Sequence, residues 1–225
     1  MAEIAADLPE GALTYTRPVT RIALLSTSDS DLLSARASGA DYGYANPAKT
    51  AASDLLALAE GSDLVVYRFL GSPQSLGADF AQLRALGKPV VVLGGEQAPD
   101  AALMELSTVA IGVASQAHIY LAQGGPVNLA QLHAFLSDTI LLTGVGFEPP
   151  AEQASWGELP RETLEPRTGG AVRPRIGILF YRAQYAAGNT AYVTALADAI
   201  DAAGGGGVPV YASSLRDPPD EWIAH

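Results

Sequence analysis

The chain has 225 residues, 48% of them apolar and 16% charged, so it can bury a real hydrophobic core and is not a disordered chain. Its formal net charge is −11 with only 13 Lys and Arg, which disfavours a broad nucleic-acid surface because phosphate binding needs clustered basic side chains. The absence of cysteine excludes disulfides, thiolate metal sites and thiol catalysis.

Residues 1–18 contain no basic start followed by an apolar block, so they do not form a secretory signal. No apolar run approaches the roughly 18 residues that a membrane-spanning helix needs. We therefore expect a cytoplasmic protein that does not contact a membrane.

The first 147 residues alternate strand-like and helix-like segments. Strands are expected at 20–26, 62–70 and 88–95, and helices at 31–40, 50–60 and 77–87. Such alternation is typical of a parallel sheet covered by helices on both faces. The sequence thus predicts an α/β domain over residues 1–147 with a parallel sheet of the Rossmann or flavodoxin-like kind.

The end of this domain is expected to be mostly helical. Residues 99–107 and 115–122 are predicted helices, and 108–113 is a candidate strand between them. Asn128 is expected to cap a long helix over 129–142 that stops near Gly144.

A change of composition follows, because residues 148–174 are rich in proline, which fixes φ and removes a backbone donor. We expect a semi-extended linker there, pinned at Trp156. Beyond it, a strand at 175–181, a helix at 190–203 and a strand at 208–215 form one βαβ unit with a right-handed crossover. One such unit leaves strand edges and a sheet face uncovered, so residues 175–225 are interpreted as the truncated start of a second α/β domain in a longer protein.

Familiar catalytic motifs are absent. NPAKT at residues 46–50 lacks the glycines of a phosphate loop, and the glycines at 204–207 follow a helix rather than a strand. His118, His133 and His225 have no second metal ligand at helical spacing. The serine-rich loop at 27–31 has no G-x-S-x-G elbow, so its plain role is helix capping.

Ligands of open parallel sheets settle outside the carboxyl ends of the strands, where residues 26–31, 94–96 and 182–190 are expected. In the last loop, Arg182 offers a guanidinium fork, Gln184 an amide, Tyr185 an amphipathic ring and Asn189 a spare donor. Together they suit a large ligand edged with amides or carboxylates. The alternative, which the pattern alone favours, is that Asn189 caps a helix, Gly188 turns the chain and Arg182 pairs with an acidic neighbour.

At this point a family resemblance becomes visible. The chain resembles the CobN and magnesium chelatase H-subunit family over nearly its whole length, in RIGILFYRAQYAAGNTAYVTALADAI and VPVYASSLRD and, upstream in the same order, in LLSTSDSDLLSARA, ANPAKT, the stretch 93–144 and GFEPP. Members are several times longer than this chain, which matches their amino-terminal part.

The resemblance implies the large subunit of an ATP-dependent cobaltochelatase acting in cobalamin synthesis. Such a subunit binds a corrin-type tetrapyrrole, hydrogenobyrinic acid a,c-diamide, and inserts Co²⁺ as substrate. ATP and Mg²⁺ are handled by separate AAA+ subunits of the CobS and CobT type, which agrees with the missing phosphate loop. The isolated fragment is expected to be inactive.

On this resemblance the expected substrate-binding residues are Arg182, Gln184, Tyr185, Asn189 and Thr190. No metal ligand and no catalytic residue is assigned. Gln184 is not given a catalytic role because an amide does not titrate near neutrality. Two alternatives remain open: a non-catalytic scaffold whose acidic first domain docks basic partner subunits, or a magnesium chelatase H subunit acting on protoporphyrin. A free-standing flavodoxin-like domain is disfavoured by the unfinished second domain.

Overall fold

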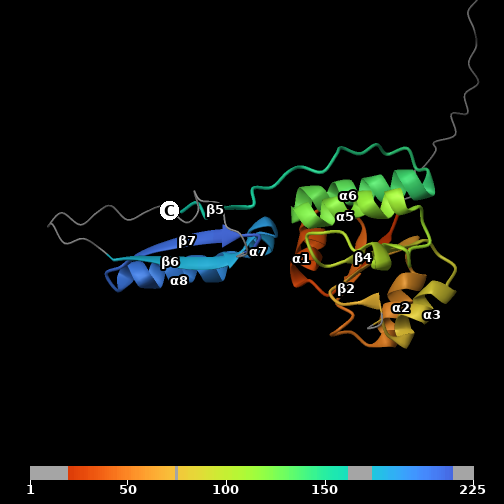
Figure 1. Ribbon diagram of the computed structural model, residues 1–225, viewed down its shortest axis with the longest axis horizontal. Helices are drawn as coiled ribbons and strands as arrows, with labels where there is room; N and C mark the ends of the chain where they lie inside the picture. The colour runs from red at the N-terminus through yellow and green to blue at the C-terminus, as the bar shows by residue number, and fades with distance from the viewer. Residues whose placement is uncertain (1–19, 74–75, 162–173, 215–225) are drawn as a thin grey trace, which may run out of the picture.

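The computed structural model describes residues 20–73, 76–161 and 174–214. Two sheets follow one another along the chain (Figure 1). The elements of the first part are β1 (Ile22–Ser26), α1 (Asp29–Ala37), β2 (Tyr42–Ala45), α2 (Ala52–Glu60), β3 (Leu64–Phe69), α3 (Ala78–Ala85), β4 (Val90–Gly94), α4 (Ala101–Met104), α5 (Ile111–Gln123) and α6 (Gly125–Leu141). The second part holds β5 (Trp156–Glu158), β6 (Arg175–Tyr181), α7 (Arg182–Ala186), α8 (Ala191–Ala202) and β7 (Gly206–Ala212).

The first sheet is parallel, with strand order β2-β1-β3-β4, and helices cover both of its faces (Figure 1). One apolar core lies between the sheet and α1, α5 and α6, and a second lies between the sheet and α2 and α3. Because both faces are covered, every residue of β1 and β4 is buried, which explains their continuous apolar sequences. The predicted α/β fold with a flavodoxin-like sheet is confirmed.

Two local predictions in this part are wrong. The candidate strand at 108–113 does not form; the main-chain N–H of Thr108 bonds to Val90, and α5 begins at Ile111. Asn128 does not cap the long helix, since α6 begins earlier, at Gly125, with a proline in its first turn. The chain reverses between α5 and α6 at Gly124, whose φ of 70° favours glycine.

The second sheet has strand order β5-β7-β6, with β6 parallel and β5 antiparallel to β7. Helix α8 covers one face, where Gly207 permits close approach: a Cβ at this position would lie 2.8 Å from the Cα of Ala197. The predicted βαβ unit is therefore present. The segment expected to be a linker contributes β5 at Trp156, while residues 162–173 lie outside the described residues.

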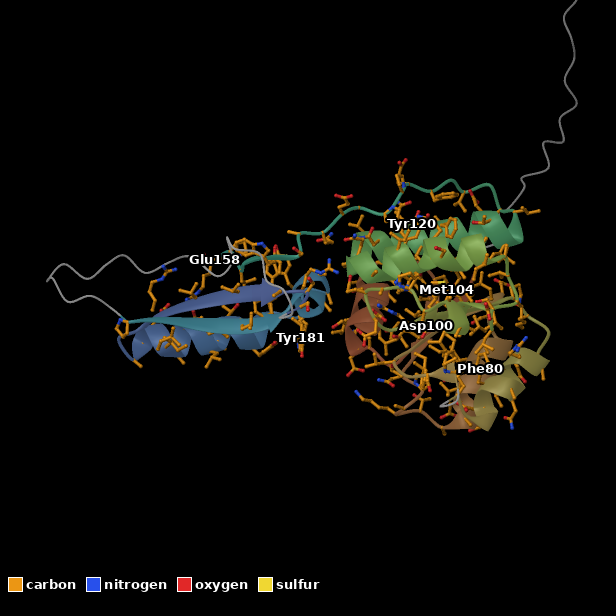
Figure 2. All side chains as sticks on the ribbon, in the orientation of Figure 1. Phe80, Asp100, Met104, Tyr120, Glu158 and Tyr181 are labelled. Carbon is orange, nitrogen blue, oxygen red and sulfur yellow. The ribbon has the colours of Figure 1, made fainter. Side chains whose placement is uncertain are left out.

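A segment that we call the strap, residues 143–155, runs along α6 toward the second sheet (Figure 1). Most of its hydrogen-bonded main-chain groups pair with side chains of α5 and α6, and at its end the carbonyl of Ser155 accepts the N–H of Ser213, which follows β7. Asn128 both donates to and accepts from the main chain of Ala151. Tyr120 lies beneath the strap and donates to the carbonyl of Glu148 (Figure 2). Further strap N–H groups are accepted by Gln123, Gln131 and Asp138.

A buried ion pair lies at the centre of the first sheet. Arg68 of β3 is 5% exposed and its Nη1 lies 2.8 Å from Oδ1 of Asp31 in α1, which is 6% exposed. Ser26 of β1 donates its hydroxyl to the other Asp31 oxygen at 2.6 Å. Arg68 also donates to the carbonyls of Gly94, Gly95 and Leu121. A single side chain thus ties β3 to α1, β4 and α5.

Replacing Arg68 by methionine should lower the free energy of unfolding by about 3–5 kcal/mol, because Asp31 would remain buried without its cationic partner. Urea denaturation followed by circular dichroism measures this. The control is Lys49→Met, which removes the exposed ion pair with Asp29 and should cost at most about 1 kcal/mol. Equal losses in the two variants would show that burial of the Arg68 pair does not matter.

Candidate functional site

The crevice where flavodoxin-like sheets take a ligand is occupied here by the protein's own side chains. In strand order 2-1-3-4 the switch point lies between β1 and β3. At that point Ser26, Asp31 and Arg68 are buried and bonded to one another. The space that remains beside them is a cleft of about 100 Å³ that also includes Arg182. The loop at 26–31 therefore serves the core of the sheet, and the loop at 94–96 borders a separate groove.

Arg182 lies against the first part of the molecule, at the border of this small cleft. It begins the short helix α7 directly after β6, and it is 6% exposed. Its Nη2 donates to the carbonyl of Ala122 at 2.5 Å and its Nη1 to that of Gln123 at 3.2 Å. Burial lowers the pKa of Arg182 below its ordinary value. The acidic neighbour considered from the sequence is replaced by these two main-chain acceptors.

The acceptors lie at the carboxyl end of α5, which is capped by side chains. The last four carbonyls of a helix lack helical partners, and that end carries a partial negative charge. Here Arg68 donates to the carbonyl of Leu121, and Arg182 donates to those of Ala122 and Gln123. Two guanidinium groups therefore meet the same helix end, one from each sheet.

Gln184 lines a pocket of about 330 Å³ at the carboxyl ends of β6 and β7. Tyr192 of α8 donates its hydroxyl to Oε1 of Gln184 at 2.5 Å, which leaves the amide nitrogen as the donor for other groups. Tyr181, 71% exposed, stands at the end of β6 and forms another wall (Figure 2). The remaining lining consists of Leu179, Phe180, Ala212 and Ser214.

The other predicted site residues lie outside this pocket's lining. The ring of Tyr185 stacks on Tyr211, with centroids 4.0 Å apart and planes 7° from parallel. Burial, and then the neighbouring Tyr185, raise the pKa of Tyr211. Asn189 is exposed and is not the helix cap that was predicted, because Thr190 occupies the N-cap position of α8 and makes no side-chain cap bond. Gly188 does turn the chain, with φ of 71°.

The structure therefore separates residues that are adjacent in sequence. Of the five predicted side chains, Gln184 faces the pocket, Arg182 faces α5 and Tyr185 faces Tyr211. Tyr181 and Tyr192 were not predicted as site residues. Tyr181 could have been identified from the sequence, because it is the last strand residue before the turn. Tyr192 reaches the pocket only through the relative placement of α7 and α8, which no sequence pattern indicates.

His118 is a buried histidine of α5. Its Nε2 lies 3.0 Å from the carbonyl oxygen of Gln97, and its Nδ1 has no hydrogen-bond partner among the described residues. Burial lowers the pKa of His118, and the nearby Arg68 lowers it further, while the Gln97 carbonyl opposes them. Burial also lowers the pKa of His133, whose Nε2 contacts the carbonyl of Thr20.

Neither a metal cluster nor a membrane span is found in the described ranges. Within 20–73, 76–161 and 174–214, no three His, Asp or Glu side chains gather where they would hold a metal ion. In the same ranges every helix is too short or too polar to traverse a bilayer.

Comparison with known proteins gives consistent matches. Residues 118–224 match the family model described as CobN/Magnesium Chelatase. The aerobic cobaltochelatase subunit CobN of a Sinorhizobium species is 31% identical over 144 residues, covering 57% of this chain and 11% of that protein. The subunit of the same name from Pseudomonas aeruginosa is 29% identical over 143 residues, covering 58% and 11%.

Among solved structures, the catalytic subunit of cobaltochelatase from Mycobacterium tuberculosis is similar with a TM-score of 0.67 and 47% sequence identity. The match covers 92% of this chain and 17% of that one. The chain thus spans about a tenth of the length of the curated relatives and about a sixth of that structure.

Stability should decrease as the pH falls below about 6.5. The folded chain keeps His118 and His133 neutral because their pKa values are lowered, whereas the unfolded chain protonates them near the ordinary value of 6.5. The unfolding free energy from urea titrations at pH 7.5, 6.5 and 5.5 should show this loss. In His118→Gln, whose amide can still donate to the Gln97 carbonyl, the loss should be smaller. If the unfolding free energy of His118→Gln fell with pH as steeply as that of the parent, His118 would not be a source of this loss.

Replacing Arg182 by alanine should loosen the second sheet from α5, since the two carbonyls lose their donors. The chain has no cysteine, so spin labels can be placed at Ser115→Cys and Ala195→Cys without background. Double electron–electron resonance should give a broader distribution of the distance between the two labels for Arg182→Ala than for the parent. The control Arg175→Ala removes only the exposed 3.9 Å pair with Glu158 and should leave the width unchanged. Equal widths for all three would show that Arg182 does not hold the two parts together.

Proposed function

We propose that this chain, which belongs to the CobN/magnesium chelatase family, is part of a CobN-type cobaltochelatase subunit and takes part in holding a corrin-type tetrapyrrole while Co²⁺ is inserted. The observation that carries the proposal is the 47% identity, over 92% of the chain, to the solved catalytic subunit of a cobaltochelatase. The activity belongs to the intact subunit and its complex in the cytoplasm, and the isolated chain is inactive.

The substrate in this proposal is hydrogenobyrinic acid a,c-diamide, a macrocycle edged with carboxylates and amides. The pocket at the ends of β6 and β7 supports it chemically. Tyr181 and Leu179 offer exposed apolar surface to a macrocycle face, and the amide nitrogen of Gln184 donates to a carboxylate or amide oxygen. A volume of about 330 Å³ is near the low end for ligand pockets, so it accommodates one edge of the ligand.

The chain's contribution to metal insertion is binding and orientation rather than proton transfer. Insertion removes two pyrrole-type protons and strips water from Co²⁺. The pocket is lined by one amide, two phenols, a serine and apolar side chains, with no carboxyl or imidazole group among these described residues. The base that accepts the protons is therefore assigned to other parts of the intact subunit. ATP and Mg²⁺ are assigned to AAA+ partner subunits of the CobS and CobT type.

Arg182 has a positioning role in this scheme. It lies three residues after Leu179 and two before Gln184 in the chain, yet its guanidinium group is bound to the end of α5. It therefore fixes the pocket wall relative to the first sheet. Tyr185, Asn189 and Thr190 lie outside the pocket lining, so they are not assigned a contact with the substrate here.

Two alternatives have support. The family model is described as CobN/Magnesium Chelatase, so an H subunit acting on protoporphyrin is the first alternative, whereas the relatives named above are cobaltochelatases. A scaffold that only docks partner subunits is favoured by the engagement of Arg182 and Arg68 with main-chain groups instead of an open site.

Titration of the purified chain with hydrogenobyrinic acid a,c-diamide, followed by absorbance and tyrosine fluorescence, tests these roles. We expect saturable binding that weakens about tenfold in Gln184→Leu, because a hydrogen bond to a charged group is lost. The matched control is Gln82→Leu, an exposed glutamine of α3, which should bind like the parent.

Each outcome selects one role. A folded chain that does not bind the corrin precursor is a scaffold, and the tetrapyrrole proposal for this pocket is then wrong. Binding that Gln184→Leu leaves intact places the ligand elsewhere on the chain. Tighter binding of protoporphyrin than of the corrin precursor favours the magnesium enzyme.

A further inference from the structure

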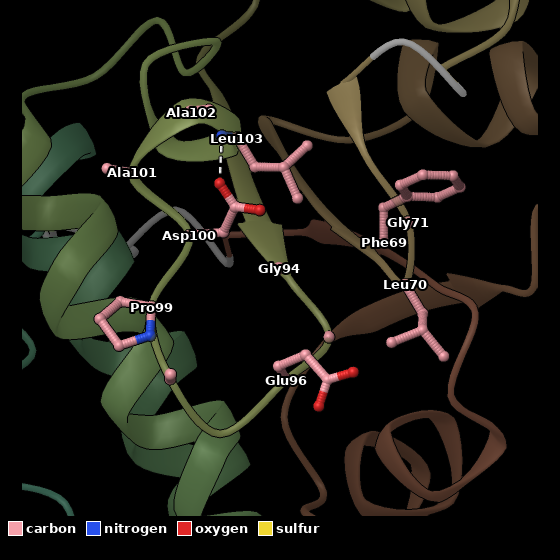
Figure 3. Close-up of a pocket in the computed structure, with 12 residues that line it drawn as sticks. Phe69, Leu70, Gly71, Gly94, Glu96, Pro99, Asp100, Ala101, Ala102 and Leu103 are labelled. Carbon is pink, nitrogen blue, oxygen red and sulfur yellow. Dashed lines mark hydrogen bonds between the residues drawn. The ribbon is translucent and has the colours of Figure 1, made fainter.

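A groove with a volume of about 810 Å³ lies at the carboxyl ends of β3 and β4, apart from the tetrapyrrole pocket proposed above. Its walls are the end of β3 with Leu70 and Gly71, the loop that follows β4, and α4 (Figure 3). It is open rather than enclosed. An open groove suits a segment of another protein better than a small molecule, which pockets usually bury by about 70–90%.

The floor and walls of the groove are apolar. Phe69 rests on the core beneath β3, while Leu70 is 61% exposed and projects beside the loop (Figure 3). The other apolar side chains of the lining are those of Ala98, Pro99, Ala101, Ala102 and Leu103. Gly95 keeps this surface accessible, because a Cβ there would lie 3.2 Å from the Cβ of Leu70 and press it out of place. Removing this surface from water would stabilise a complex.

The charged groups of the groove are both acidic. The carboxylate of Glu96 points toward Leu70, and that of Asp100 lies at the start of α4 (Figure 3). Asp100 accepts the N–H of Leu103 through Oδ1 at 3.1 Å, and Oδ2 keeps its capacity to accept from a ligand. No Lys, Arg or His is among the described lining residues. The guanidinium of Arg68 is buried and bound to the carbonyls of Gly94 and Gly95.

We propose that this groove docks a partner-protein segment in which an apolar side chain is flanked by Lys or Arg. The apolar residue would lie against Leu70 and Phe69, and the cation would pair with Glu96 and Asp100. The net charge of −11 adds a long-range attraction for a basic partner. An acidic segment, or a carboxylate-bearing macrocycle, would be repelled by the same groups. The inference stands whether or not the chain binds a tetrapyrrole.

The test uses a short fluorescein-labelled peptide in which leucines alternate with arginine and lysine, and a control peptide with glutamate in place of both cations. Fluorescence anisotropy at low salt should show saturable binding of the basic peptide alone. Amide chemical shifts of the ¹⁵N-labelled chain should change at residues 69–71 and 94–103. Binding should weaken with added salt, since both carboxylates are near the surface.

Variants separate the two components of the groove. Glu96→Gln combined with Asp100→Asn should weaken binding about fivefold, as expected for one exposed and one half-buried ion pair, and asparagine preserves the helix cap. Leu70→Asn should weaken binding by about tenfold or more. The control Glu105→Gln alters an exposed acid outside the lining and should have no effect.

Three results would overturn the proposal. The first is that the basic peptide fails to bind to the folded chain, and the second is that the acidic peptide binds equally well. The third is that the chemical shifts change over other acidic surfaces instead of the groove. Thermal unfolding of each variant by circular dichroism confirms that a loss of binding is not a loss of folding.

Discussion

The carboxyl end of α5 is the point on which the arrangement of both sheets depends. A helix end that is buried must find donors for its last carbonyls, and here two arginines provide them. Arg68 arrives from the centre of the first sheet and Arg182 from the first helix after β6. Because each guanidinium is planar and has its donors in a fixed fork, the carbonyls define the direction as well as the position of each side chain. The orientation of the second sheet is thus tied to a helix that packs on the first.

This arrangement explains why the usual ligand position of a flavodoxin-like sheet is closed. Arg68, which donates to the end of α5, is a buried cation and needs an anionic partner. Asp31 provides it at the switch point between β1 and β3. The polar side chains at the switch point therefore stabilise the fold and do not bind a ligand. Concave surface remains at the ends of β3 and β4 and at the ends of β6 and β7, away from the closed crevice.

Much of the fold could be predicted from the sequence, because β1, β3 and β4 are continuous apolar runs separated by helical segments. The short strand β2, with sequence YGYA, has neither alternation nor a sustained apolar run, and β5 is three residues long and is recognisable only through its pairing with β7. The residues 108–113 are rich in β-branched side chains, but the chain there meets the edge of β4 and turns into α5. Tertiary context overrides propensity in each case.

The candidate site was harder to predict. That a turn after a strand faces a pocket follows from general topology, which is why Gln184 could be named. The partners of Arg182 lie about 60 residues earlier in the chain and are main-chain carbonyls, which no side-chain pattern reveals. The strap has a related consequence for how such a chain can vary. Most of its main-chain hydrogen bonds are made with side chains of α5 and α6, and Pro149 and Pro150 fall between the N–H groups that are used. Two of its own side chains also make contacts: the ring of Phe147 packs edge-on against Phe135, and Thr143 donates to Asp138. Outside those two positions and the positive-φ glycines Gly144 and Gly146, substitutions in residues 143–155 should be tolerated more readily than replacement of Gln123, Asn128 or Gln131, whose side-chain amides hold the main chain of the strap.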